Sequence, residues 1–139
     1  MDIRTIDATI SVAGQIKASD VEAIAKAGFR SIICNRPDGE GLLQPACDGI
    51  EQAAKAAGLE FKYQPVQSGA VYDHDVKDFE KAIDAVTKPV LAYCRTGTRC
   101  TVLWSLSQAN KRDLPEILSM ASDAGYDMSG LTDRIIGSK

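Results

Sequence analysis

The sequence predicts an α/β fold with three layers, in which a mainly parallel sheet is covered by helices on both faces. Two observations indicate it. Short apolar, β-prone segments alternate with longer segments of helical periodicity, which is typical of βαβ units. One segment, residues 90–93, is apolar throughout, as expected for a strand buried on both faces. The length of 139 residues suits one domain, residues 1–139, with its own core.

The ends of each element are marked by turn and capping residues. Ser19 or Asp20 can cap the first helix and Pro45 can begin the second, while Gly28 and Gly58 end them. Strands are expected at residues 10–13, 29–34, 59–63 and 90–93. Helices are expected at residues 20–27, 45–57, 76–86, 101–110, 114–124 and 128–136.

The composition excludes several classes of function. A net charge of −3 indicates no general nucleic-acid or membrane surface. Residues 1–7 contain no long apolar run, so we expect neither a signal peptide nor a membrane span, and the expected location is cytoplasmic. The four cysteines show neither a CxxC motif nor metal-ligand spacing. They are therefore expected to be free thiols, and no metal or organic cofactor is implied.

Residues 94–99 lie between the apolar strand and a helix, and they carry the candidate chemistry. The free N–H groups and the dipole of a helix N-terminus bind anions, and they lower the pKa of a thiol placed there. A cysteine after a strand is more often a small buried residue, but its combination with Gly97 and Arg99 favours a nucleophile. Cys94 and Arg99 are the predicted catalytic residues. The residues expected to bind substrate beside them are Arg95, Thr96, Gly97 and Thr98.

Three loops are expected at one rim of the sheet, because ligands in such folds lie beyond the carboxyl ends of the strands. They are residues 35–41, 64–75 and 94–99. Arg36 could add a guanidinium to an anion site there, or it could be a solvated arginine in a turn. Asp75 could protonate a leaving group, or it could cap the next helix, which we favour.

The sequence Cys94-Arg95-Thr96-Gly97-Thr98-Arg99 resembles the active-site loop of rhodanese-type sulfurtransferases, in which four residues separate the cysteine from the arginine. Cysteine-dependent phosphatases are similar, but five residues separate the pair and a histidine usually precedes the cysteine. This chain has Tyr93 at that position. Since tetrahedral phosphate needs the wider ring and a terminal sulfur fits the narrower one, the loop length favours sulfur chemistry.

A second resemblance extends over nearly the whole chain. Segments 35–40, 57–59, 65–66 and 93–99 are similar to the phosphatase-like domain of the beta-lactamase hydrolase-like family. This resemblance implies a fold like that of dual-specificity phosphatases. It also implies a role in sulfide and persulfide handling, with a persulfide dioxygenase or another sulfide-oxidising enzyme as partner.

Cys100 departs from these families, which usually have serine or threonine after the loop arginine. It could act as a resolving thiol that takes the sulfane sulfur or forms a disulfide with Cys94. The alternative, which we favour, is a small residue packed at the helix start. Asp38 and Glu40 are interpreted as turn-forming and capping residues.

These observations lead to one main functional prediction and two alternatives. The main prediction is a rhodanese-like sulfurtransferase that passes sulfane sulfur through a Cys94 persulfide to a thiol or to cyanide. Its expected partner is a small sulfur-containing anion or a low-molecular-weight thiol. The first alternative is a cysteine-dependent phosphatase with a Cys94 thiophosphate intermediate. The second is a non-catalytic persulfide sensor.

Overall fold

The computed structural model describes residues 1–139 and contains one five-stranded sheet. Its strands are β1 (Ile3–Thr5), β2 (Ile10–Ala13), β3 (Ser31–Cys34), β4 (Glu60–Tyr63) and β5 (Val90–Tyr93), in the order β1-β2-β5-β3-β4. β1 runs antiparallel to β2, and every other pair is parallel. β5 is central, and all four of its residues are buried. The predicted α/β fold with a mainly parallel sheet is confirmed.

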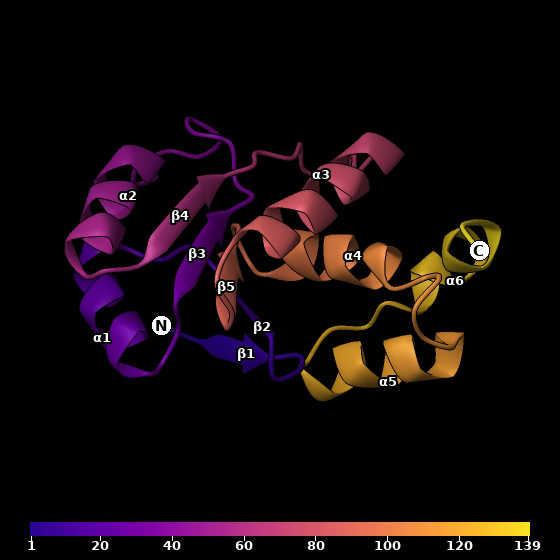
Figure 1. Cartoon of the computed structure of the whole chain (residues 1–139). Coiled ribbons are helices and arrows are strands. Elements are labelled where there is room, and N and C mark those ends of the chain that lie inside the picture. Colours follow the sequence, from indigo (N-terminus) through magenta and orange to yellow (C-terminus); the bar gives the residue numbers. More distant parts are fainter.

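Helices cover both faces of the sheet, so the molecule has three layers (Figure 1). The α-helices are α1 (Val21–Lys26), α2 (Cys47–Ala56), α3 (Asp73–Ala85), α4 (Thr98–Ser107), α5 (Leu114–Asp123) and α6 (Thr132–Gly137). Two 3₁₀ turns, η1 (Ala18–Asp20) and η2 (Ser129–Leu131), precede α1 and α6. No helix has both the length and the apolar character needed to cross a membrane.

Alternate residues of β5 separate the core into two clusters. Leu91 and Tyr93 point to one face, where they join α1 and α2 in a cluster of 12 buried residues. Val90 and Ala92 point to the other face, where a cluster of 21 buried residues includes members of α3, α4, α5 and α6. This alternation is the period of two that a strand imposes. Burial on both faces explains why residues 90–93 are apolar throughout.

The register of the sheet aligns the carboxyl ends of its parallel strands. Tyr93, the last residue of β5, pairs with Ala13 at the end of β2 and with Cys34 at the end of β3. Cys34 in turn pairs with Tyr63, the last residue of β4. The loops that follow these strands therefore begin at one level of the sheet, which is where a ligand site is expected.

Several boundaries differ from the sequence-based expectation. β1 was not expected, because three partly exposed residues on an antiparallel edge carry no recognisable pattern. α3 begins at residue 73 rather than 76, because the polar residues of its first turn were assigned to the preceding loop. α4 begins at residue 98 rather than 101, so Thr98 and Arg99, which the sequence places in the loop, belong to the helix.

Candidate active site

Cys94 follows β5 directly and lies in front of the N-terminus of α4. The N–H group of Gly97 donates to the Cys94 Sγ atom at 3.1 Å. Gly97 is the residue that caps α4, and its φ of 87° lies in the left-handed region that glycine adopts without steric cost. The unpaired amides of the helix start thus converge on the sulfur, which is the anion-binding geometry that the sequence predicts.

The pKa of Cys94 is lowered to about 6. The largest cause is a hydrogen bond from the Cys100 thiol, and the backbone N–H groups of Cys100, Thr96 and Gly97 add to it. Together these bonds outweigh burial, which acts in the opposite direction. Cys94 is therefore mostly a thiolate at neutral pH, the form that acts as a nucleophile.

Cys100 remains protonated because it is fully buried beside that thiolate, and both factors raise its pKa well above the ordinary value. Its Sγ atom also lies 3.2 Å from Asn35 Oδ1. A thiol carries one proton, so Cys100 can serve only one of these two acceptors at a time. The charged acceptor, Cys94, forms the stronger bond, and Cys100 thus occupies the place of a hydroxyl donor at the start of α4.

The ionisation of Cys94 can be measured by alkylation. The rate of modification by iodoacetamide is expected to rise with pH through a midpoint of about 6, because only the thiolate reacts. Burial raises the pKa of Cys34 and that of Cys47, the latter to about 12, so Cys94 alone should react at neutral pH. Cys100→Ala should move the midpoint upward by removing the largest stabilising bond. Cys100→Ser, which retains a donor, should move it less, and an unchanged midpoint in Cys100→Ala would contradict this account.

Arg99 is held by acceptors from two other loops. Its Nη1 atom donates to the carbonyl oxygens of Val66 at 2.9 Å and Asn35 at 3.3 Å, and its Nη2 atom donates to Glu40 Oε1 at 3.0 Å. The side chain is only 7% exposed, yet its Nε atom has no partner. A buried N–H group without an acceptor is costly, and an anion bound beside Cys94 would supply the missing acceptor.

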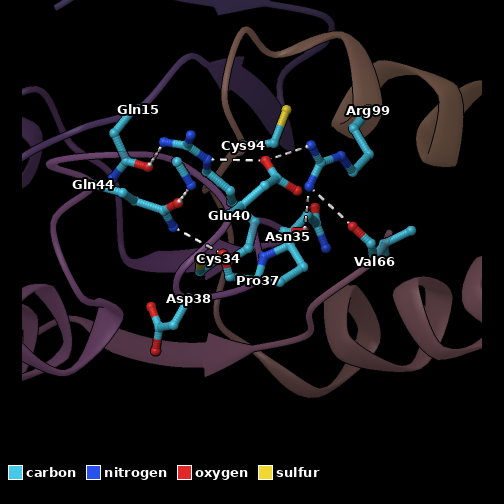
Figure 2. Close-up of polar contacts among 12 residues, drawn as sticks. Gln15, Cys34, Asn35, Pro37, Asp38, Glu40, Gln44, Val66, Cys94 and Arg99 are labelled. Carbon is cyan, nitrogen blue, oxygen red and sulfur yellow. Dashed lines mark hydrogen bonds and ion pairs between the residues drawn. The ribbon is translucent and has the colours of Figure 1, made fainter. Parts of the chain in front are cut away.

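Glu40 joins Arg99 to Arg36, and in Figure 2 its carboxylate lies between Gln15 and Arg99. Its Oε1 atom accepts from Arg36 Nε at 3.0 Å as well as from Arg99. Arg36 also donates through Nη1 to Gln15 Oε1 at 3.0 Å. Partial burial would raise the pKa of Glu40, but the bonds from both arginines lower it, so the carboxylate stays ionised. The sequence analysis treated Glu40 as a turn residue and missed this role.

Replacing Glu40 by glutamine is expected to destabilise the protein by about 2 kcal/mol, because it leaves buried guanidinium charge without a carboxylate. Urea unfolding would measure the change. Glu22→Gln is the matched control, since Glu22 forms only an exposed ion pair with Lys26 on α1 and should cost less than about 0.5 kcal/mol. Equal decreases in the free energy of unfolding would show that the Glu40 carboxylate does not stabilise the fold through Arg36 and Arg99.

A cleft of about 510 Å³ lies in front of Cys94. Its lining comes from the loop after β4, from the Cys94 loop and α4, and from η2 and α6. The lining residues are Ser68, Gly69, Val71, Cys94, Arg95, Thr96, Thr98, Arg99, Val102, Leu131 and Arg134. None of them is acidic. The sequence does not indicate Leu131 or Arg134 as site residues, because nothing in a short turn and helix near the C-terminus shows that they reach a loop more than thirty residues earlier in the chain.

The candidate site residues from the sequence fall into three groups. Arg95, Thr96 and Thr98 line the cleft with Cys94 and Arg99. Gly97 and Cys100 contact Cys94 but do not line the cleft. Arg36 binds the Glu40 oxygen that Arg99 also binds, and it lies outside the cleft. Asp75 also lies outside it: its Oδ2 atom accepts from the Tyr72 N–H group at 2.9 Å at the start of α3, as expected for a capping role.

Two contacts fix the backbone of the Cys94 loop from outside. The N–H group of Gln15 donates to the Arg95 carbonyl at 3.1 Å, and the Tyr126 hydroxyl donates to the Thr96 carbonyl at 3.0 Å. The loops after β2 and α5 therefore hold the ring of donors in shape. No group of three or more His, Cys, Asp or Glu side chains is gathered closely enough to hold a metal ion.

The fold and the thiolate–arginine loop define the class of cysteine-phosphatase-like domains. A structure from Neisseria meningitidis, provisionally assigned as a phosphatase, is 38% identical, covers 100% of this chain and 99% of its own, and gives a TM-score of 0.89. The catalytic domain of the Saccharomyces cerevisiae PP-IP phosphatase SIW14 is 15% identical with a TM-score of 0.70 over 99% of this chain and 84% of its own, which supports the fold alone.

Sequence comparison identifies the family. Residues 2–111 match the phosphatase-like domain of beta-lactamase hydrolase-like proteins. Beta-lactamase hydrolase-like proteins from Xylella fastidiosa and Agrobacterium fabrum are 36% and 31% identical over 92% and 91% of this chain. The chain belongs to this family, as the sequence resemblance predicts. It spans about 30% of the length of these curated relatives.

The main functional prediction, a rhodanese-like sulfurtransferase, is wrong. The matched family is phosphatase-like, and the similar solved structures are phosphatases or are assigned as such. Neither the matched family nor these structures support persulfide chemistry or sulfide detoxification. The prediction relied on the number of residues between Cys94 and Arg99, but that number alone does not set the anion site. The left-handed Gly97 closes the short loop while its N–H group still reaches the sulfur.

Proposed function

We propose that this chain is a cysteine-dependent phosphatase that hydrolyses phosphate monoesters through a thiophosphate on Cys94. The observation that carries the proposal is that an ionised thiol and an arginine with a buried, unpartnered Nε atom line the same cleft. Membership of a phosphatase-like family supports it. A phosphoryl group beside Cys94 would give the Nε–H group the acceptor that it lacks.

The reaction has two balanced steps. In the first, the Cys94 thiolate attacks phosphorus, a P–S bond forms and the P–O ester bond breaks. No carboxyl group lines the cleft, so the departing oxygen takes its proton from water. In the second, water attacks phosphorus, the P–S bond breaks, and inorganic phosphate leaves as the thiolate is restored. Without an acid beside the leaving group, we expect esters of acidic alcohols such as phenols to react fastest.

The intermediate itself tests the proposal. An aryl phosphate would be mixed with the protein, the reaction stopped with acid during turnover, and the protein digested for mass spectrometry. Phosphate carried on the peptide that contains Cys94, together with an initial burst of phenol, is the expected result. Phosphate release without any modified Cys94 peptide would overturn the covalent mechanism, and no phosphate release from any aryl or alkyl ester would overturn the activity.

A further inference from the structure

The cleft in front of Cys94 contains more positive charge than one phosphoryl group requires. Three of its lining residues are arginines, namely Arg95, Arg99 and Arg134, and none is acidic. The whole chain, by contrast, has 19 acidic and 16 basic residues. This local excess of positive charge is a feature of the cleft rather than of the surface in general, and it attracts anions that carry more than one charge.

Arg134 is separate from the ring of donors around Cys94. It lies on α6, whereas Arg99 lies in the first turn of α4. The same cleft is also lined by the apolar side chains of Val71, Val102 and Leu131. Arg134 makes no hydrogen bond to Cys94 or to Arg99, since its side chain pairs with Asp73. If the free Nε–H group of Arg99 binds the reacting phosphoryl, Arg134 is available to a different part of the ligand.

The one partner of Arg134 is easily exchanged. Its Nη2 atom lies 3.2 Å from Asp73 Oδ1, and the two side chains are 37% and 88% exposed. Exposed pairs of this kind contribute little, so an anionic ligand could replace Asp73 at small cost. Glu40, which neutralises Arg99, is in contrast part of a half-buried network and is not available for exchange.

We propose that Arg134 binds a second anionic group of the substrate, so that this cleft selects small phosphate monoesters whose apolar body carries another phosphate or a carboxylate. The reacting phosphoryl binds at Cys94 and Arg99, the carbon body contacts Val71, Val102 and Leu131, and the second anion replaces Asp73 at Arg134. A volume of about 510 Å³ suits a small organic molecule. That the ligand is hydrolysed rests on the proposed phosphatase activity. The preference for binding ligands with two anionic groups does not depend on that activity.

Two matched ligands test this proposal. Phenyl phosphate carries one anionic group, and phenyl phosphate with a carboxylate on its ring carries two. Arg134→Gln is expected to raise KM for the second ester by about tenfold and to change KM for the first by less than about twofold. Arg134→Lys should recover part of the loss. Arg30→Gln is the charge-matched control, because Arg30 is exposed and outside the cleft, and it should affect neither ester.

Binding separates this proposal from the proposed activity. Calorimetry with the Cys94→Ser protein, which should not turn over, would measure the affinity for both esters with Arg134 present and with Arg134→Gln added. A preference for the ester with two anions that disappears in the double variant supports the inference, even if the wild-type protein hydrolyses neither ester. Equal affinities of the two esters, or equal losses for both on Arg134→Gln, would overturn it.

Discussion

Cys94→Ser is expected to lower the rate of phosphate release by at least about 10⁴-fold. The Cys94 pKa of about 6 makes the wild-type side chain an anion at neutral pH, whereas a serine hydroxyl stays protonated. No base lies among the residues that line the cleft, so nothing there would activate the serine. Release of inorganic phosphate from an aryl phosphate, followed with enough protein to detect slow turnover, would measure the loss.

Cys47→Ser is the matched control for this variant. Cys47 is also buried, but its Sγ atom donates to Asp38 Oδ2 at 3.3 Å, and its pKa of about 12 keeps it protonated. A serine can donate in the same way, so activity should remain within about twofold of wild type. Comparable losses in both variants, or an active Cys94→Ser protein with an unchanged melting temperature, would remove Cys94 from the mechanism.

The features of the site that a local pattern encodes could be predicted from sequence. The apolar run of β5, the glycine and the helix start fall within one short segment, and together they place Cys94 at an anion-binding N-terminus. The rule that ligands lie beyond strand ends also brought three loops to one rim. The structure confirms that arrangement, because Arg99 contacts Asn35, Glu40 and Val66.

Contacts between distant segments could not be predicted in this way. Glu40 and Arg99 are 59 residues apart, and Arg134 and Asp73 are 61 apart. A glutamate in a polar loop and an arginine in a short terminal helix have ordinary local explanations, so neither residue signals its partner. The choice between sulfur transfer and phosphate hydrolysis could not be predicted from the local sequence either. A count of residues between cysteine and arginine describes chain length, whereas the position of each donor depends on the backbone conformation, including the left-handed Gly97.

Arg99→Lys is expected to lower kcat/KM by about 10²- to 10³-fold, although it preserves the charge. The guanidinium can bind Glu40 and two carbonyl oxygens through its Nη atoms while its Nε–H group remains for the phosphoryl. An ammonium group is a single point donor and cannot serve both sides at once. Steady-state kinetics with an aryl phosphate would measure the loss, most of which should be in kcat because the charge of the phosphoryl group spreads in the transition state.

Arg36→Lys is the control variant for Arg99→Lys. Arg36 binds the same Glu40 oxygen but does not line the cleft, so its replacement should disturb Arg99 only indirectly and lower kcat/KM by less than about tenfold. If the two lysine variants lost activity equally, the loss would come from the geometry of the whole network around Glu40 and not from the free Nε–H group of Arg99. If Arg99→Lys alone is impaired, the free Nε–H group is the feature that connects the fold to the reaction, because it is the donor that the network leaves unused.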